Sequence, residues 1–353
     1  MNSKEILVKV LEYLLSQKSK QLKDVRKILI IKQHDQIGDL IQILPTIKSL
    51  NDNFPDAEFY LLARPYTKDI MHENPLFKEV LAFHTHPCKW GSNSFLFRKR
   101  FDVGIVMNTV SHSLTSDILA CLLCKVTIGA DHPLIRGSRT SFLYNIKTEA
   151  IEKGQQWEKY SSVLKAFNLE TPVWLPLLEI SDEEKKKGAS IIKEVADCEN
   201  PVAIHPLHRD IRRRWAISLF ARLIISIEMK TGNKPLIVWG PKEEALRDRL
   251  QTHLHGRGNF IPKTNIRELM GILFNSSCLI GTDTATYHIA SALGKPTLTL
   301  YGDVSPDEWL PPSGKSFAIE SPEGNIRKLG YEKVEKEVFS FLDFISTNNP
   351  CPA

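Results

Sequence analysis

The sequence predicts an α/β protein built on two doubly wound parallel sheets. Its 353 residues exceed what one hydrophobic core usually serves, and they suit two α/β domains. Short apolar runs alternate with segments of helical periodicity, which is the pattern of parallel strands joined by helices. Residues 278–302 show this pattern most compactly, because an apolar run, a helical segment ended by Gly294 and a second apolar run follow one another.

The first half of the chain is expected to hold five strands with helices between them. Residues 1–27 predict a helical extension that packs on the first domain; the alternative is a basic amphipathic helix resting on an anionic membrane. Pro45 should interrupt the first helix, because proline breaks helical hydrogen bonding. Segment 84–100 is expected to be a solvated surface loop; the alternative is a loop that faces substrate. We expect strands at 27–32, 59–63, 80–83, 101–107 and 126–129, and helices at 40–52, 115–124 and 156–167.

The second half repeats the alternation after an expected connection at 171–178. A helix should begin after Ser181, since a capping serine precedes an acidic first turn. The expected domains are 1–172 and 173–325, with a helix in 326–353 that returns to the first domain. We expect strands at 202–205, 236–239, 260–261, 278–280 and 297–301, and helices at 217–229, 241–250, 266–274, 284–293 and 330–345.

Composition limits the classes of partner. The net charge of +5 is mild; it fits an anionic substrate or an anionic membrane surface, and it does not indicate nucleic acid. Cys121 and Cys124 form a CxxC within an apolar helical run, so buried thiols are favoured over a zinc or redox site. The sequence contains no secretory signal and no apolar run of bilayer-spanning length, and we expect a cytoplasmic protein.

The stretch from Gly281 to Gly302 carries the first candidate site. Thr282 or Asp283 can cap the helix that follows, and a helix start after a strand offers N–H groups to an anion. Thr284 and His288 are four residues apart, so two polar side chains share one face of a helix otherwise suited to burial. The alternative is an ordinary strand–helix–strand unit with a capping aspartate.

Two further segments offer acid–base and phosphate-binding groups. Asp39 follows Gly38 between a strand and a helix, where a carboxylate can act as a general base or merely cap the helix. A basic cluster follows the strand 202–205 and suits bidentate phosphate contact, or is a solvated loop. Its members are Arg209, Arg212, Arg213 and Arg214. Glu243 and Glu244 start a helix. The sequence lacks the glycine-rich patterns of P-loop and dinucleotide-binding proteins, so neither class is supported.

These segments together resemble the ADP-heptose:lipopolysaccharide heptosyltransferases, glycosyltransferase family 9, over about residues 27–310. The stretch GTDTATYHIASALGKP resembles the family's donor-site motif, with Ala285 in place of the usual glycine and Ser291 in place of alanine. The segments ILIIKQHDQIGDLIQILP and FPDA match the N-terminal signature. HPLHRDIRRRWAISLFARLI matches the segment whose phosphate-binding lysine falls at Arg213, with Leu207 and Ala216 replacing glycine and proline. VWGPKEEALRDRL resembles the segment that approaches the nucleoside.

The resemblance implies the GT-B fold, in which two Rossmann-like domains face a cleft, and inverting sugar transfer without an obligatory metal or cofactor. Asp39 is then the general base, with His34 and Gly38 at the acceptor. The implied donor-binding residues are Arg212, Arg213, Glu243, Glu244, Asp283, Thr284, Ala285 and His288.

The implied donor is ADP-heptose, and the implied acceptor is a lipid-linked or core oligosaccharide. Transfer would then occur in the cytoplasm, with peripheral contact with the anionic inner membrane as an alternative. Two alternatives to the function remain: a related transferase with another donor or acceptor, and a non-catalytic module that binds a sugar nucleotide or glycan.

Overall fold

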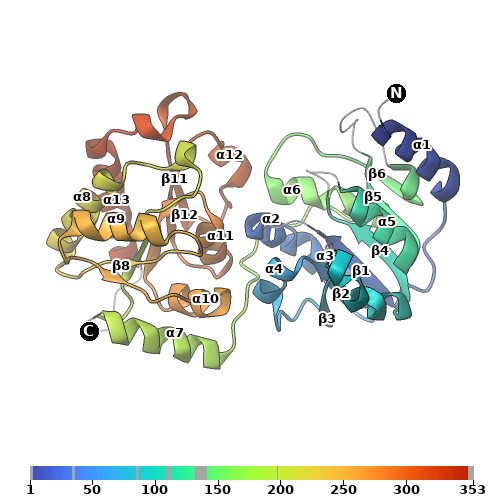
Figure 1. Ribbon diagram of the computed structural model, residues 1–353, viewed down its shortest axis with the longest axis horizontal. Helices are drawn as coiled ribbons and strands as arrows, with labels where there is room; N and C mark the ends of the chain where they lie inside the picture. Colours follow the sequence, from blue (N-terminus) through green and yellow to red (C-terminus); the bar gives the residue numbers. More distant parts are fainter. Residues whose placement is uncertain are drawn as a thin grey trace. The chain divides into compact units, whose positions relative to one another are not determined.

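The computed structural model describes residues 3–33, 36–84, 87–108, 113–131, 141–196 and 198–348. The chain forms two compact units, Met1–Trp174 and Leu175–Ala353, which divide two residues beyond the expected boundary. Each unit contains one six-stranded parallel sheet (Figure 1). The strand orders are β3-β2-β1-β4-β5-β6 and β12-β11-β10-β7-β8-β9, so the chain reverses its direction of travel between β1 and β4 and between β7 and β10. The predicted fold class, with two Rossmann-like units, is confirmed.

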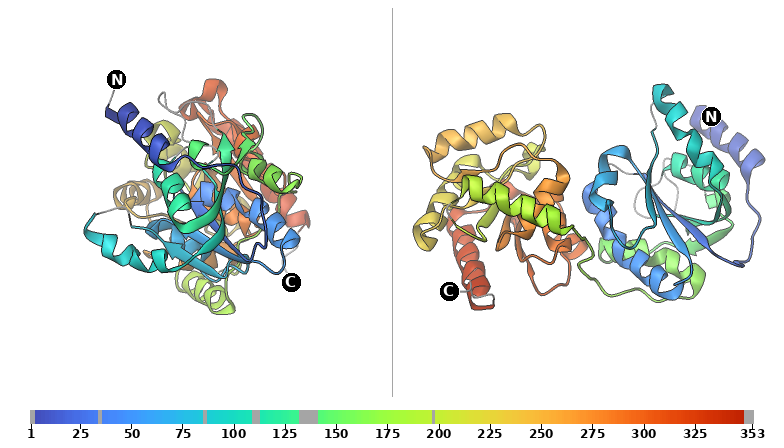
Figure 2. Two further views of the ribbon diagram at one scale, coloured as in Figure 1. Left: turned by 90° about the vertical axis from the view of Figure 1, so that its right-hand side faces the viewer. Right: turned by 90° about the horizontal axis from the view of Figure 1, so that it is seen from below.

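The first unit places helices on both faces of its sheet (Figure 2). Helix α5 packs against the face that carries Leu29 and Ile31, while α2, α3 and α6 contact one another. Strand β1 is buried on both faces because it is central, which explains its continuous apolar run. The strands are β1 (Lys27–Lys32), β2 (Glu58–Ala63), β3 (Glu79–Ala82), β4 (Phe101–Val106), β5 (Cys124–Asp131) and β6 (Ile146–Glu149). The helices are α1 (Ser3–Leu15), α2 (Ile37–Gln42), α3 (Leu44–Asn53), α4 (Pro65–Lys68), α5 (Leu114–Leu123) and α6 (Gln156–Ser161), with 3-10 helices η1 (Asp69–Met71), η2 (Pro87–Arg98), η3 (Ser141–Leu143) and η4 (Ser162–Phe167).

Two local expectations for this unit can be compared with the structure, and one strand was missed. The interruption at Pro45 is confirmed, because α2 ends at Gln42 and α3 begins at Leu44 with the proline in its first turn. The expected surface loop at 84–100 is wrong, since η2 buries Leu96 and the Asn93 amide bonds the backbone of His84. Strand β6 was not expected; it is short, and only Thr148 of its four residues is buried.

The N-terminal extension forms α1, which contacts η3 of the same unit. The Gln17 N–H donates to the Phe142 carbonyl at 2.8 Å and secures the chain just after the helix. This agrees with the expectation that the extension packs on the first domain. Cys121 and Cys124 are partly buried, and burial raises the pKa of the Cys121 thiol to about 12.

The second unit repeats the architecture of the first. The capping box predicted at Ser181 is present, with Glu184 bonding back to the Ser181 N–H at the start of α7. Gly188 of α7 and Gly271 of α10 let these helices touch, because a Cβ on Gly188 would lie 2.1 Å from the Gly271 carbonyl carbon. The strands are β7 (Val202–His205), β8 (Leu236–Ile237), β9 (Asn259–Phe260), β10 (Cys278–Thr282), β11 (Thr297–Tyr301) and β12 (Ser316–Glu320). The helices are α7 (Asp182–Val195), α8 (Ile217–Thr231), α9 (Glu244–Leu254), α10 (Ile266–Phe274), α11 (Ala285–Ala292), α12 (Pro306–Trp309) and α13 (Tyr331–Asn348), with 3-10 helices η5 (Ile211–Arg213), η6 (Pro322–Gly324) and η7 (Ile326–Lys328).

Helix α13 corrects the expectation that the last helix returns to the first domain. It packs on α8 of the second unit, and Phe341 makes an edge-on contact with Phe317 of β12. Lys230 of α8 pairs with Asp343 at 2.9 Å. The apolar face of the helix is thereby buried within its own unit. Within the described part of the chain, no helix combines the length and apolar character needed to cross a membrane.

Candidate functional site

The first polar cluster lies at the carboxyl edge of the first sheet. Lys32 ends β1 and is fully buried, and its Nζ donates to the Tyr160 hydroxyl at 2.8 Å and to the Met107 carbonyl at 3.2 Å. The Tyr160 hydroxyl in turn donates to Asp39 Oδ1, which lies 4.0 Å from Lys32 Nζ. Lys32 also lies 4.1 Å from the centroid of the Tyr160 ring. An ammonium, a phenol and a carboxylate are thus connected in one chain of contacts.

Burial changes the protonation of two members of this cluster. The pKa of Lys32 is lowered to about 8, because burial disfavours the ammonium more than the charge of Asp39 favours it. Burial and the neighbouring carboxylate raise the pKa of Tyr160 well above its usual value. The phenol therefore keeps its proton and donates a hydrogen bond to Asp39. The lysine is therefore a positive group that can be neutralised in the mildly alkaline range.

Asp39 does not cap its helix. It lies in the first turn of α2, whose N-cap residue is Gln36, and no side chain caps this helix. The competing interpretation of Asp39 as an N-cap is therefore wrong. Gly38 precedes it inside α2 rather than in a turn, and His34 lies outside the described residues.

The second cluster lies at the corresponding edge of the other sheet. His205 ends β7, and its two ring nitrogens contact Thr284 Oγ1 at 3.0 Å and Glu243 Oε2 at 3.1 Å. Glu243 is buried and also accepts from the Gly240 N–H at 2.7 Å. Burial raises the pKa of Glu243, but the bonds from His205 and Gly240 outweigh burial and hold it below the usual 4.5.

Thr284 links this histidine to α11. It is the N-cap residue of that helix, yet its side chain makes no cap bond because its hydroxyl contacts His205. The expected capping by Thr282 or Asp283 is also absent, since α11 has no side-chain cap. The start of the helix therefore keeps N–H groups available for an anion.

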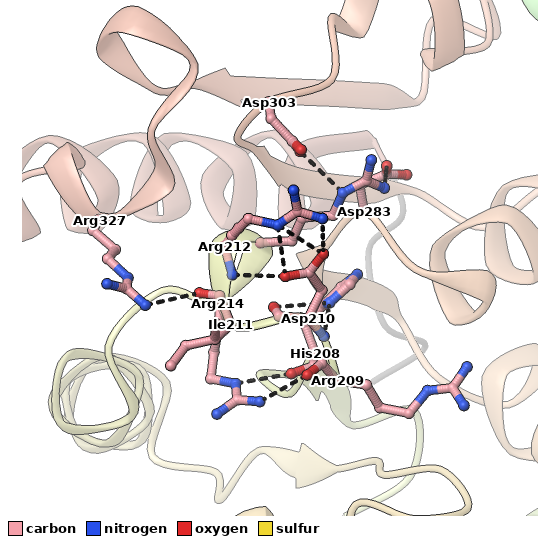
Figure 3. A network of polar contacts seen from close by, with 10 residues as sticks. His208, Arg209, Asp210, Ile211, Arg212, Arg214, Asp283, Asp303 and Arg327 are labelled. Carbon is pink, nitrogen blue, oxygen red and sulfur yellow. Dashed lines mark hydrogen bonds and ion pairs between the residues drawn. The ribbon is translucent and has the colours of Figure 1, made fainter.

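Arg213 joins the basic segment to this helix start through two carboxylates. Figure 3 labels these carboxylates, Asp283 and Asp303, together with residues of the basic segment. Its Nε lies 2.9 Å from Asp303 Oδ1, and its Nη1 lies 3.7 Å from Asp283 Oδ2. His288 Nε2 lies 3.5 Å from the other oxygen of Asp283. Burial raises the pKa of Asp283, but His288 and, to a smaller extent, Arg213 lower it by more than burial raises it. The pKa of Asp283 therefore lies below its usual 3.8. One arginine, one histidine and two carboxylates thus meet beside α11.

Other members of the predicted donor site lie differently. The guanidinium of Arg212 faces Asp210 in a two-pronged contact, and its side chain is 76% exposed. Glu244 lies in the first turn of α9 and faces Lys263 at 3.7 Å, so only Glu243 of the pair joins the buried cluster. Ala285 is the first residue of α11, where an ordinary helical conformation needs no glycine. His288 is buried against Trp309 and Tyr287.

Sequence reasoning missed four members of the two clusters. His205 and Asp303 follow or end apolar runs at the carboxyl edge of the sheet, so their positions could have indicated them. Lys32 reads as the flank of a strand. Tyr160 carries no local signal, because it lies 121 residues from Asp39 and comes from a different helix.

Comparisons with known proteins give one family. The model of glycosyltransferase family 9 (heptosyltransferase) matches residues 94–339. Lipopolysaccharide heptosyltransferase 3 of Escherichia coli is 23% identical over 291 residues, which cover 78% of this chain and 83% of that protein. A family 9 glycosyl transferase from Veillonella parvula superimposes with a TM-score of 0.76 at 17% identity, covering 91% and 98% of the two chains. The E. coli ADP-heptose lps heptosyltransferase II superimposes with a TM-score of 0.73 at 18% identity, covering 90% and 99%.

Proposed function

The chain belongs to glycosyltransferase family 9, the heptosyltransferases, and from this membership we propose that it transfers a heptose from ADP-heptose to a sugar of a lipopolysaccharide core. The names of the relatives support both substrates, since one is an ADP-heptose lps heptosyltransferase and another a lipopolysaccharide heptosyltransferase. The family match includes the basic segment and the stretch around α11. The enzyme class is therefore glycosyl transfer, and the donor and acceptor are the proposal.

The observation that carries the mechanism is the carboxylate of Asp39, held through one oxygen by Tyr160 and Lys32. Because Oδ1 is engaged, Oδ2 is the oxygen proposed to take the proton of the acceptor hydroxyl. The acceptor oxygen forms a bond to the anomeric carbon as the bond from that carbon to the diphosphate breaks. The electron pair leaves with ADP, and attack from the opposite side inverts the configuration.

The second unit is proposed to hold the donor. Arg213 and the free N–H groups at the start of α11 would neutralise the negative charge that grows on the departing diphosphate. The contact between Arg213 and Asp303 would then be exchanged for a contact with phosphate, which a guanidinium can bind in bidentate geometry. His205 would fix Thr284, and Asp283 and His288 would complete the wall of the donor site.

A transfer assay with a donor panel tests this function. The purified chain is titrated with ADP, UDP and GDP by calorimetry and then assayed with the corresponding sugar nucleotides and a core oligosaccharide. We expect tight binding of ADP and transfer from ADP-heptose. A clear preference for UDP or GDP would instead support the second candidate, a family 9 transferase with another donor, which the replacements at Leu207 and Ala285 favour.

Peripheral contact with an anionic membrane is a further part of the proposal. On α1, Tyr13 is 89% exposed and Leu14 is 66% exposed, and lysines follow the helix. Exposed aromatic and aliphatic groups beside basic residues suit the boundary of an anionic bilayer. Co-sedimentation with vesicles that contain phosphatidylglycerol should fall in a Tyr13→Ser, Leu14→Ser variant. Equal sedimentation of parent and variant would leave α1 a packing element only.

A further inference from the structure

Two buried amide side chains flank the point where the first sheet reverses its order, and the proposed mechanism uses neither. Gln33 directly follows Lys32 and β1, and Asn108 directly follows Met107, two residues beyond the end of β4. Strands β1 and β4 are neighbours, with Ile31 opposite Val106. In open α/β sheets, the crevice beyond the carboxyl ends of two such strands is where ligands bind.

These amides lack hydrogen-bond partners that buried groups normally have. Asn108 is 3% exposed, and within the described ranges neither its Oδ1 nor its Nδ2 has a partner. Gln33 is 7% exposed; its Nε2 donates to the Leu62 carbonyl at 3.0 Å, but its Oε1 has no partner among the described residues. Such groups are rare in folded proteins, because burial without a partner is destabilising.

A third buried amide in the same unit shows the usual situation. Asn145 is 5% exposed, and its Oδ1 accepts from the Thr127 N–H at 2.9 Å. Its Nδ2 donates to the Lys18 carbonyl at 2.7 Å. Asn145 thus serves the fold, while Asn108 has the same side chain and similar burial with nothing in the described chain to bond. Among the described residues, Asn108 and Gln33 therefore keep hydrogen-bonding atoms that a ligand can pair.

The free atoms select the chemistry of that ligand. Gln33 Oε1 can only accept, because the amide nitrogen is assigned by its bond to a carbonyl. It therefore needs a donor, which a carboxylate or a phosphate dianion does not provide. Asn108 offers one acceptor and a donor group, which suits neighbouring hydroxyls of a sugar. Lys32 connects these positions with Asp39: it precedes Gln33 in the chain, and its Nζ bonds the Met107 carbonyl and lies 4.0 Å from Asp39 Oδ1.

We propose that Gln33 and Asn108 bind uncharged hydroxyl groups of the acceptor sugar, beside the hydroxyl that Asp39 deprotonates. This inference rests on the proposed transfer to a sugar acceptor, and it names the residues that recognise that acceptor. The two amides select a polyhydroxylated ring by hydrogen bonds that the described part of the chain does not supply. A site of this kind rejects a ligand that lacks the matching hydroxyl, because the buried amide then stays unpaired.

The test compares Asn108→Leu and Gln33→Met, which keep shape and remove the amide, with the matched control Asn145→Leu. Lipid-free core oligosaccharide is the probe, used both as acceptor with saturating ADP-heptose and in calorimetry without donor. For Asn108→Leu we expect an acceptor KM about 10- to 100-fold higher, a smaller change in kcat and unchanged ADP binding. Gln33→Met should raise the KM about tenfold, in line with one lost bond.

Thermal unfolding separates recognition from structure. Asn108→Leu should melt at the same temperature as the parent or higher, because it removes an unpaired buried group. Asn145→Leu should melt lower, with the acceptor KM of the folded protein unchanged. The proposal is overturned if Asn108→Leu leaves the KM within twofold of the parent, as a buried water in the crevice would predict, or if it melts as low as Asn145→Leu with normal acceptor binding.

Calorimetry of oligosaccharide binding without donor allows the proposed subsite and the proposed transfer reaction to fail separately. If the parent transfers no heptose but binds the oligosaccharide, and Asn108→Leu loses that binding, the proposed reaction fails and the hydroxyl subsite stands. If the parent transfers heptose and both variants bind the oligosaccharide as the parent does, the reaction stands and the subsite fails. Absence of any oligosaccharide binding by the parent overturns the subsite whatever the donor result.

Discussion

At the switch point of the first sheet, between β1 and β4, the polar side chains of the described residues include one lysine, one tyrosine, one carboxylate and two neutral amides. At the switch point of the second sheet, between β7 and β10, a histidine links Thr284 to Glu243, and Arg213 meets two carboxylates nearby. The two sheets have the same strand order, so topology alone does not account for this difference.

The comparison separates the place of a site from its chemistry. In both units the described polar side chains lie at the carboxyl ends of the strands, where open α/β sheets have their ligand crevice. The residues then decide what each crevice holds. Neutral amides suit the hydroxyl groups of a sugar and the carboxylate of Asp39 suits removal of a hydroxyl proton, whereas Arg213 and the uncapped start of α11 suit a diphosphate. The following substitutions test this division of roles.

The largest effect is expected from Asp39→Asn in the first unit. An amide still accepts from Tyr160 but cannot remove a proton, so kcat should fall about 10²- to 10⁴-fold. ADP binding should stay near that of the parent, because the second unit is unchanged. The matched control is Asp52→Asn on α3, which removes an exposed pair with Lys48 and should leave turnover intact. Turnover within a few-fold of the parent would remove Asp39 from the role of base.

Lys32 predicts that the stability of the first unit depends on pH in the alkaline range. Its folded pKa of about 8 lies below the ordinary 10.5, so between these values the unfolded chain holds a proton that the folded chain has lost. Stability therefore rises with pH across this window, by about 3 kcal/mol for a shift of this size. Urea unfolding of parent and Lys32→Met from about pH 7 to pH 10 measures it. The rise should be missing from Lys32→Met and present in the control Lys48→Met; an identical rise in all three would refute the assignment.

Arg213→Ala tests the second crevice. Loss of a charged hydrogen bond should weaken ADP binding by about 1.5–3 kcal/mol in calorimetry. Arg213→Lys should keep part of the affinity, because a point charge remains without the bidentate contact. The control is Arg257→Ala, an exposed arginine in the loop before β9. ADP affinity equal to the parent in Arg213→Ala would place the diphosphate elsewhere.

The smallest effect is expected from Glu243, through the dependence of the stability of the second unit on pH in the acid range. The pKa of Glu243 is held below 4.5 in the folded chain, so its contribution to stability is complete above that value and is lost as pH falls through the folded pKa. Glu243→Gln should therefore unfold with a weaker dependence on pH below about 4.5 than the parent. Thermal melts across that range measure it, with Glu244→Gln, a change at the partly exposed neighbour, as control. Equal acid sensitivity in parent and Glu243→Gln would contradict the prediction.

Local sequence was sufficient wherever one segment determines its own structure. The β1 and β11 strands, the capping box at Ser181, the break at Pro45 and helix α10 all follow from periodicity and short-range chemistry. The motifs around Asp39, Arg213 and Asp283 also indicated both crevices, because each follows a strand at the carboxyl edge. The sequence could not place α13, since an amphipathic helix fits any apolar surface and only packing against α8 selects one.

What the sequence by itself determined is the fold class, the family and the segments that carry chemistry. The tertiary structure decided which side chains act together. Tyr160 reaches Asp39 from 121 residues away, and His205 joins Thr284 to Glu243 across 79 and 38 residues. The same holds for Asn108, whose lack of partners among the described residues is revealed by no local pattern. The physical reason is that hydrogen bonds and burial depend on distance in space, while propensity and capping depend on distance along the chain.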